Sequence, residues 1–362
     1  MKRAIIGVLA LLTVATFVGF QLKTRSAPPQ VQFFTADNPN IQYMGRIDNS
    51  NPKKPRFWNP GVTVKASFMG SFCDVVLNDE QLWGNSYNYL EVVVDDKPPF
   101  RIRTKGKTNT LRVAEGLADG IHSLSISKNT EGGMGYLEFV GLRATGLVSP
   151  APLPQRKLEF YGDSITCGAS SDISTAACGK GTWYDQHNAF MSYGPTTARN
   201  LDAQWHLTSV SGIGMMKSCC DMKQTMQDVW DKTNLRENTL PWDFKRYQPS
   251  AVMVCLGQND GAQNAEKFRE TYITFLRKLR GVYPESEIVC LSSPMADANL
   301  RTWMKQNLTQ IVADLNKSGD QRVRAFFFSR GFNSGCGGHP NIAEHQQIAG
   351  ELTGFLKTSF GW

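Results

Sequence analysis

A proline-rich segment divides this chain into two halves that carry different patterns of apolar residues. The segment reads VSPAPLPQ, spans residues 148–155 and contains three prolines. Proline fixes φ and has no backbone N–H, so such a run interrupts helices and central strands alike. We therefore expect a domain boundary here, with one domain over residues 31–147 and a second over residues 156–362.

The first half predicts strands and no convincing helix. Short stretches such as VTVKASF, YLEVVV and HSLSIS are separated by Gly, Asn, Asp and Pro. Many short strands with frequent turn signals are typical of β-sandwiches. We therefore predict an all-β jelly-roll sandwich for residues 31–147.

Apolar strand-like runs alternate with helical periods in the second half. The predicted strands are KLEFYG, QWHLTSV, AVMVCLG, EIVCLSS and VRAFFFS, and the predicted helices cover residues 188–201, 266–283, 301–318 and 341–360. Such alternation is typical of a parallel sheet with crossover helices. We therefore predict an α/β fold for residues 156–362.

The N-terminus has the pattern of an export signal. Lys2 and Arg3 precede an uncharged, largely apolar run over residues 4–20. This run is longer than a common signal-peptide core and slightly shorter than the ~20 residues of a membrane-spanning helix. Residues 1–27 are therefore interpreted as either a cleaved signal peptide or an uncleaved anchor, and in the second case residues 4–20 would tether the protein to a membrane. Both alternatives predict a periplasmic, cell-surface or secreted protein.

The composition does not favour nucleic acid, metal or cofactor binding. The formal net charge is +7, but four of the basic residues lie within the first 27 positions, where there is no acid. The remainder has no basic run with interleaved aromatic residues, so no nucleic-acid partner is expected. The five histidines have no Asp or His at ligand spacing, and no cofactor-binding motif is present. We expect neither a metal nor a cofactor.

Four short loops that follow predicted strands carry the candidate catalytic residues. Ser164 lies in YGDSITCG, Gly212 in SGIGM, Asn259 in LGQND and His339 in GCGGHPN. In open parallel sheets, ligands bind at the edge where the strands end. We therefore expect these four loops to meet at one edge of the sheet.

Together these residues supply what acyl transfer needs. A serine hydroxyl needs an adjacent base to act as a nucleophile, and His339 is the candidate base. The developing oxyanion needs donors fixed in place, which the backbone N–H groups of Ser164 and Gly212 and the amide of Asn259 could provide. Each residue alone also has an ordinary explanation, as a helix cap, a turn or a surface loop residue. Their common placement at strand ends favours the catalytic interpretation.

The four motifs resemble the four conserved blocks of SGNH/GDSL hydrolases. They are GDS at residues 162–164, Gly212, GQND with Asn259, and HP at residues 339–340. The stretches GRIDNSNPKKPRFWNPG, GLADGIHSLSISKNTEG and RKLEFYGDSITCG are further similar to carbohydrate esterase family 2. That family joins a jelly roll to a flavodoxin-like, three-layer α/β/α SGNH domain and removes acetyl groups from plant polysaccharides.

The resemblance implies a role for each candidate. Ser164 would be the nucleophile, and His339 the general base and then the general acid for the leaving alcohol. Gly212 and Asn259 would complete the oxyanion hole with the Ser164 N–H. Asp163 and Asp260 are interpreted as supports for their loops. Sugar or acetyl contacts are expected from residues in or near the same loops, namely Trp183, Tyr184, Trp230 and Met215.

The sequence departs from the family pattern where a triad acid is expected. SGNH enzymes commonly carry Asp three residues before the histidine, and relatives in this family carry it two before; here these positions are Cys336 and Gly337. The third member of a triad orients the imidazole and stabilises its charged form. We therefore expect a Ser–His dyad in which a backbone carbonyl binds the Nδ1 proton of His339.

The eight cysteines fit an oxidising compartment. A bridge from Cys167 to Cys178 or to Cys336 would connect active-site loops, and we state both as hypotheses. Cys336 as a nucleophile is disfavoured because two glycines follow it and export favours a disulfide. Cys255 and Cys290 lie inside apolar strands and are expected to be buried free thiols.

The leading functional hypothesis is an exported esterase that removes O-acetyl groups from a polysaccharide or oligosaccharide. One alternative is an esterase for another acyl ester. The other is a two-domain carbohydrate-binding protein with weak or lost esterase activity, which the missing triad acid keeps open.

Overall fold

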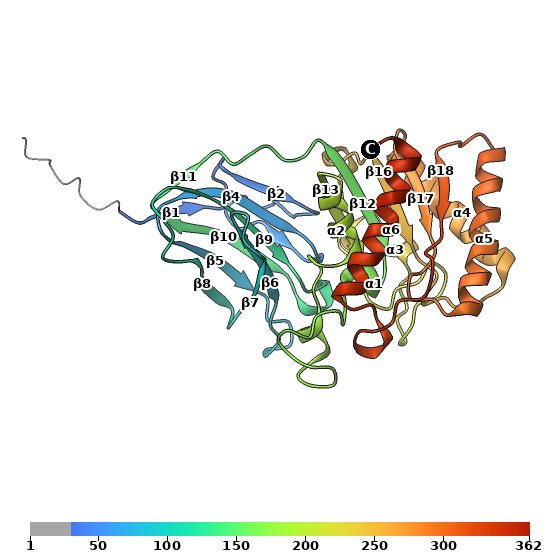
Figure 1. Cartoon of the computed structure of the whole chain (residues 1–362), viewed down its shortest axis with the longest axis horizontal. Helices are drawn as coiled ribbons and strands as arrows, with labels where there is room; N and C mark the ends of the chain where they lie inside the picture. Colours follow the sequence, from blue (N-terminus) through green and yellow to red (C-terminus); the bar gives the residue numbers. More distant parts are fainter. Residues whose placement is uncertain (1–29) are drawn as a thin grey trace, which may run out of the picture. The chain divides into compact units, whose positions relative to one another are not determined.

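The computed structural model describes residues 30–362 and contains two sheet systems in succession along the chain (Figure 1). The predicted leader, residues 1–27, lies outside the described residues. Within the described part of the chain, no helix is long and apolar enough to span a membrane.

The first system is a sandwich of two antiparallel sheets. One sheet contains, in spatial order, β1 (Gln32–Thr35), β10 (Leu137–Ala144), β5 (Cys73–Asp79) and β8 (Thr108–Ala114), with β3 (Arg56–Phe57) also paired to β10. The other contains β11 (Gly146–Val148), β4 (Thr63–Met69), β9 (Ile121–Lys128), β6 (Tyr89–Val94) and β7 (Phe100–Arg103), with β2 (Ile41–Met44) paired to β4. Alternate side chains of both sheets form one core, which includes Val64, Val75 and Phe139. The predicted β-sandwich is confirmed.

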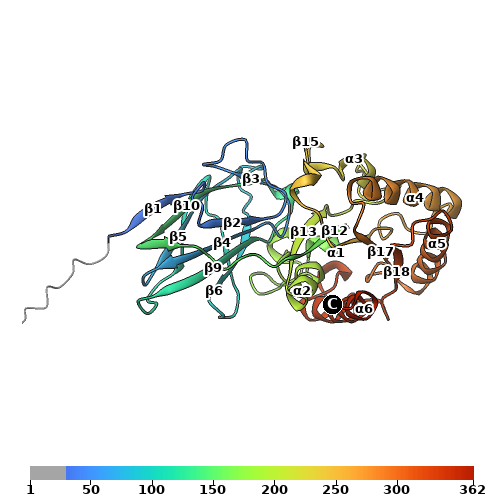
Figure 2. The ribbon, with the colours of Figure 1, turned by 90° about the horizontal axis from the view of Figure 1, so that it is seen from above.

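The second system is a five-stranded parallel sheet covered by helices on both faces. Its spatial order is β13 (Ala203–Ser209), β12 (Arg156–Gly162), β16 (Ala251–Cys255), β17 (Glu287–Leu291) and β18 (Val323–Phe326). This is the 2-1-3-4-5 order of flavodoxin-like folds. Figure 2 shows α2 (Tyr193–Asn200) and α6 (Ile342–Phe360) on one side of the sheet, with α4 (Ala265–Val282) and α5 (Ala298–Lys317) on the other. The predicted three-layer α/β/α fold is confirmed.

Short elements fill the connections. They are α1 (Ser164–Cys167), α3 (Met226–Val229), β14 (Lys232–Asn234), β15 (Thr239–Pro241) and the 3₁₀ turns η1 (Gly132–Met134), η2 (Trp183–Gln186), η3 (Phe244–Arg246) and η4 (Cys336–Gly338).

One predicted helix begins later than expected. The apolar pattern predicted a helix from residue 188, whereas α2 begins at Tyr193 after the N-cap Ser192. The preceding backbone makes hydrogen bonds to other segments. The Asn188 N–H donates to the Gly168 carbonyl at 2.9 Å, and the Ala189 N–H donates to the carbonyl of Asn129, in the sandwich, at 3.2 Å. These long-range bonds draw the segment out of helical geometry. The other three long helices begin within three residues of their predicted positions.

The sandwich packs against the edge strand β13 of the parallel sheet. The Trp205 indole N–H donates to the Gly61 carbonyl at 2.9 Å. Gly61 has φ +74°, which favours glycine, and a Cβ there would lie 2.9 Å from the end of the Leu207 side chain, so a larger residue would be strained at this contact. The sandwich is thereby placed beside the carboxyl end of β13, where the Gly212 loop begins.

Candidate active site

Ser164 is the first residue of α1, immediately after β12. Asp163 caps this short helix, because its Oδ1 accepts the Ile165 N–H at 3.0 Å. The turn is tight: a Cβ on Gly162 would lie 2.0 Å from the Thr166 hydroxyl oxygen. The Ser164 side chain is therefore held at the carboxyl edge of the sheet, on a residue with 9% exposure.

His339 reaches Ser164 from the loop between β18 and α6. Its Nε2 lies 2.9 Å from the Ser164 Oγ. Burial lowers the pKa of His339 below its ordinary value of 6.5, while the carbonyls of Cys336 and Gly337 act in the opposite direction. The imidazole is therefore mainly neutral near pH 7 and able to accept the serine proton.

The other ring nitrogen of His339 has no carboxylate partner. Among the described residues, Nδ1 makes no hydrogen bond of good geometry, and the groups that face it are backbone carbonyls. A Cβ built on Gly337 would lie 3.8 Å from Nδ1, so residue 337 adjoins the ring but brings no side chain to it.

Gly212 and Asn259 lie in the loops beside Ser164. The loop after β13 is tied to the loop after β12, because the Val210 N–H donates to the Gly162 carbonyl at 3.3 Å. Gly212 has φ +82°, and a Cβ there would lie 2.8 Å from the Cys219 sulfur, so the turn needs glycine. Asn259 Nδ2 donates to the Ile213 carbonyl at 2.9 Å and lies 3.4 Å from Asp163 Oδ2. The structure thus brings together all four residues that the sequence singled out.

The two aspartates next to these residues hold backbone in place. Asp260 accepts the N–H groups of Met215, Met216 and Lys217 at 2.8, 2.6 and 2.9 Å, which fixes the turn that follows Gly212. Asp163 caps α1, and burial raises its pKa to about 7. Burial likewise raises the pKa of Asp260. Neither carboxylate hydrogen-bonds His339 among the described residues.

No metal-binding cluster is found in the region that the structure describes. Residues 30–362 contain no group of three or more His, Cys, Asp or Glu side chains arranged to hold an ion. The expectation that the chain needs no metal or cofactor stays a prediction.

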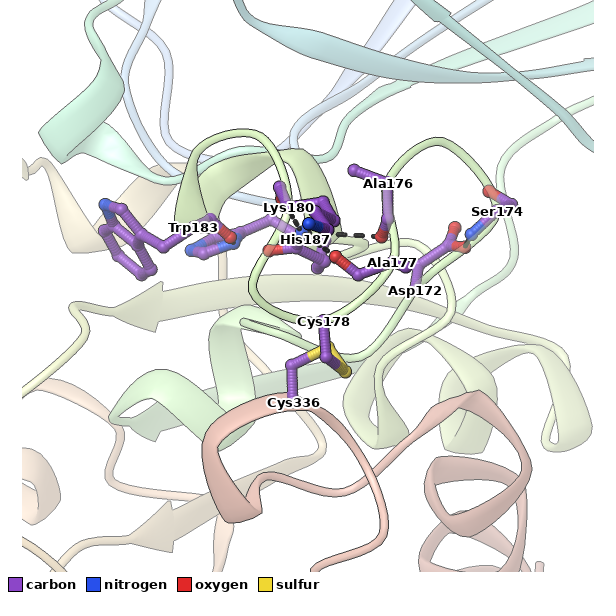
Figure 3. Close-up of a disulfide and its surroundings, with 10 residues drawn as sticks. Asp172, Ser174, Ala176, Ala177, Cys178, Lys180, Trp183, His187 and Cys336 are labelled. Carbon is purple, nitrogen blue, oxygen red and sulfur yellow. Dashed lines mark hydrogen bonds between the residues drawn. A yellow bond between two sulfur atoms is a disulfide. The ribbon is translucent and has the colours of Figure 1, made fainter.

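The disulfide hypotheses for Cys167 are wrong. Cys178 and Cys336 are bonded to each other, which joins the loop over residues 172–187 to the His339 loop (Figure 3). Cys167 is a buried free thiol whose sulfur lies 3.2 Å from the Ser209 hydroxyl oxygen. The sequence pointed to the right loops, but the pairing depends on which side chains face each other across the fold.

The remaining cysteines fall into two groups. Cys219 and Cys220, adjacent in the chain, form a second bridge beside Gly212. Cys73, Cys255 and Cys290 are buried free thiols, as expected for the two that lie in the parallel sheet.

The four residues expected to contact the substrate differ in how far they are exposed. Trp183 is 51% exposed, and its ring packs edge-to-face on that of His187 with the two centroids 4.2 Å apart. Figure 3 shows both side chains in the loop over residues 172–187. Tyr184 follows it in η2 and is half-buried. Met215 is fully buried in the core beneath α4, so its expected acetyl contact is wrong. Trp230 is half-buried and packs on Phe244 and Phe275 at the margin of the core, and its expected sugar contact stays a prediction.

Sequence reasoning missed a buried glutamate that the sandwich contributes. Glu131 is 3% exposed and follows β9. Its Oε2 accepts the Ser211 N–H at 2.7 Å, and its Oε1 lies 3.4 Å from His187 Nε2. Burial opposes its ionisation, but the contacts with His187 and Ser211 hold its pKa below the ordinary value. The signal available in the sequence was the position of Glu131 in the stretch SKNTEGG, directly before two glycines that end a strand-like run.

Comparisons with known proteins agree with this architecture. The family model described as "Carbohydrate esterase 2 N-terminal" matches residues 43–154, and the model "GDSL-like Lipase/Acylhydrolase family" matches residues 160–341. A solved family two carbohydrate esterase from Clostridium thermocellum, in complex with cellohexaose, is 32% identical. This chain covers 99% of it, and the comparison covers 89% of this chain with a TM-score of 0.80.

The chain belongs to carbohydrate esterase family 2. Another family 2 structure, from Cellvibrio japonicus, is 26% identical and has a TM-score of 0.83 over 92% of this chain and 99% of its own. The "Cellulase/esterase CelE" of Acetivibrio thermocellus is 33% identical over 90% of this chain, but the chain spans only 40% of that protein's length. An "Acetylxylan esterase / glucomannan deacetylase" of Cellvibrio japonicus is 28% identical over 97% of this chain and 98% of its own length.

Proposed function

We propose that this chain is an exported serine esterase that removes O-acetyl groups from a polysaccharide through a Ser–His dyad. The observation that carries the proposal is the 2.9 Å contact between Ser164 Oγ and His339 Nε2. Family membership supports the ester chemistry, and the name of the Cellvibrio japonicus relative, which pairs acetylxylan with glucomannan, supports an acetylated glycan as substrate.

The geometry supports a two-step acyl transfer. In the first step, His339 takes the Ser164 proton as the oxygen attacks the acetyl carbonyl, and the tetrahedral intermediate collapses when His339 protonates the departing sugar oxygen. In the second step, His339 takes a proton from water, which attacks the acetyl-enzyme. Collapse of this intermediate releases acetate and returns the proton to Ser164. The net reaction consumes one water for each ester cleaved.

Fixed donors stabilise the oxyanion in both steps. Among the hydrogen bonds of residues 30–362, the Gly212 N–H has no acceptor, so it is available to the substrate oxygen. The Asn259 amide donates to the Ile213 carbonyl at 2.9 Å and to Asp163 Oδ2 at the longer distance of 3.4 Å, so the oxyanion would take the place of the longer contact. Donors positioned before the reaction are worth about 10²–10³ in turnover each.

Backbone carbonyls take the place of a triad acid in this proposal. The Cys336 and Gly337 carbonyls favour a proton on the imidazole, because each is a dipole with its negative end toward the ring. The Cys178–Cys336 bridge holds the segment that carries them. The dyad therefore has backbone dipoles that favour the protonated imidazole, although Nδ1 makes no hydrogen bond among the described residues.

Replacement of the dyad residues tests the activity. Ser164→Ala and His339→Ala are expected to lower turnover of an aryl acetate and of acetylated xylan by about 10³-fold or more. Ser50→Ala, at an exposed serine of the sandwich, is the matched control and should retain wild-type rates. Wild-type turnover in Ser164→Ala would refute the nucleophile. Binding of xylan by the wild type without acetate release would favour a binding protein, and release of only longer acyl groups would favour the other esterase alternative.

Export is proposed on two observations. Lys2, Arg3 and the uncharged run over residues 4–20 form a leader pattern, and the Cys178–Cys336 bridge is of a kind that persists in oxidising compartments. Expression of the full chain, followed by fractionation and intact-mass measurement, separates a cleaved leader from a membrane tether. Recovery of uncleaved protein only in the cytoplasm would refute export.

A further inference from the structure

The carboxylate of Glu131 belongs to the sandwich, but its partners all belong to the α/β domain. Glu131 follows β9 and is 3% exposed. Its Oε2 accepts the Ser211 N–H at 2.7 Å and lies 3.8 Å from the Cys167 sulfur, and its Oε1 lies 3.4 Å from His187 Nε2. Within residues 30–362, no hydrogen bond or ion pair joins this carboxylate to another residue of the sandwich.

The shortest of these bonds holds the loop of the proposed oxyanion hole. Ser211 directly precedes Gly212, and a bond from a backbone N–H to an ionised carboxylate is roughly twice as strong as one between neutral groups. On the other side of Gly212, Asp260 accepts the three N–H groups of residues 215–217. The Gly212 N–H itself has no acceptor among the described residues. Two carboxylates thus hold the loop on either side of a donor that stays free for the substrate.

The other two contacts reach the segments of the nucleophile and of the base. Cys167 is the last residue of α1, the short helix that begins at Ser164. His187 ends the segment that the disulfide joins to the His339 loop. Glu131 therefore contacts all three segments that must be aligned for acyl transfer.

The sandwich presents this carboxylate on a restrained backbone. Lys128, the last residue of β9, is fully buried, and its Nζ donates to the carbonyls of Thr130 at 2.6 Å and Glu131 at 3.1 Å. Asn129 Oδ1 accepts the Phe190 N–H at 3.2 Å, which connects the same stretch to the α/β domain. A carboxylate held in this way can set the position of the loops that it contacts.

The charge of Glu131 depends on the same contacts. Burial opposes its ionisation, but the contacts with His187 and Ser211 hold its pKa below the ordinary value. An ionised carboxylate is costly to bury unless hydrogen-bond donors surround it. Here those donors come from the catalytic segments, so docking of the sandwich and the geometry of the oxyanion hole are coupled.

We propose that Glu131 is a positioning residue of the esterase, through which the sandwich fixes the Gly212 N–H in the oxyanion hole. The inference rests on the proposed esterase function and adds to it a part for the sandwich in the reaction itself. Glu131 acts through Ser211 and does not touch the reacting atoms. Its loss should lower kcat and leave KM for a small ester nearly unchanged, because the oxyanion forms only in the transition state.

Two substitutions at residue 131 test this role in the full chain. Glu131→Ala removes the acceptor and should lower kcat for an aryl acetate by about tenfold or more, since one oxyanion donor is worth about 10²–10³. Glu131→Gln keeps an acceptor oxygen for Ser211 but loses the charge, and should lower kcat several-fold. Glu138→Gln on β10 is the matched control, because its carboxylate contacts Asn78 and Arg56 within the sandwich, and it should retain the wild-type kcat.

Inhibition by methylboronic acid distinguishes positioning from stability. The Ser164 Oγ adds to boron, His339 takes the proton, and the resulting tetrahedral boronate places an oxygen in the oxyanion hole. Its Ki should rise in each Glu131 variant by about the factor by which kcat falls. A variant that only folded less well would contain fewer active molecules, which lowers the apparent kcat but leaves Ki unchanged.

The outcomes separate the positioning role from the esterase. An unchanged Ki beside a lowered kcat would overturn the positioning role while the esterase stands. Wild-type kcat in Glu131→Gln would overturn it as well, whether or not Glu131→Ala folds, and so would a rise in KM without a fall in kcat. If the wild type neither hydrolyses the aryl acetate nor binds the boronate, the proposed function itself fails.

Discussion

The base of the dyad, His339, is tuned by burial and by backbone dipoles. The Nε2 of His339 contacts Ser164, and the carbonyls of Cys336 and Gly337 face the other side of the ring. Burial lowers the pKa of His339, so the neutral, catalytically competent form persists to lower pH than for an exposed histidine. We expect kcat/KM for an aryl acetate to fall on the acid side with a midpoint below 6.5. A midpoint at or above 6.5 in a pH–rate profile would contradict this environment.

A carboxylate placed beside Nδ1 should move that midpoint. Gly337 has φ +60°, which Asp and Asn tolerate better than other residues, and its Cβ position is 3.8 Å from Nδ1. In Gly337→Asp the added charge should favour the imidazolium and raise the midpoint by about one unit. Gly337→Asn is the matched control, because it has the same shape without the charge. Identical profiles for the two variants would show that the side chain does not reach the ring.

The segment over residues 172–187 connects the sandwich to the His339 loop. Arg101 of β7 donates to the carbonyls of Asp185 at 2.8 Å and His187 at 2.6 Å, and the Cys178–Cys336 bridge joins the other side. Within the segment, Gln186 Nε2 donates to the carbonyls of Ala176 and Ala177. These bonds restrain both Trp183, within the segment, and the backbone around His339.

Loss of the bridge should reduce stability and turnover together. For the double variant Cys178→Ser/Cys336→Ser we expect a loss of about 2–4 kcal/mol in the free energy of unfolding. We also expect a several-fold lower kcat, because the carbonyls next to His339 lose their restraint. Denaturant unfolding and aryl acetate kinetics measure both. A thiol reductant should slow the wild type more than the double variant, and unchanged kcat in the variant would assign the bridge to stability alone.

Local pattern was sufficient to predict most elements and four site residues. Apolar runs and helical periods mark β12, β13, β16 and the long helices, and Ser164 and His339 stand out because they follow such elements. The beginning of α2 was not predictable, since hydrogen bonds to Gly168 and to the sandwich decide it. The same holds for the partner of Cys178 and for Glu131, whose contacts join residues far apart in the chain and leave no local periodicity.

At the scale of the whole molecule, a buried ion pair holds the sandwich to the parallel sheet. Arg46 and Glu159 are both fully buried, with a 2.7 Å contact between Nη2 and Oε1. Arg46 also donates to the Trp230 and Lys232 carbonyls, and the Tyr283 hydroxyl donates to Glu159. Every charge at this contact therefore has several partners, which is the condition under which a buried pair can be sustained.

Replacing one residue of the Arg46–Glu159 pair should lower the free energy of unfolding more than replacing both. Arg46→Met leaves the Glu159 carboxylate buried without its cation, and we expect about 3–5 kcal/mol of destabilisation in denaturant unfolding. Arg46→Met/Glu159→Gln removes the stranded charge and should recover part of that loss. Equal destabilisation of the two variants would mean that packing at this interface, and not its charges, holds the sandwich in register with the active site.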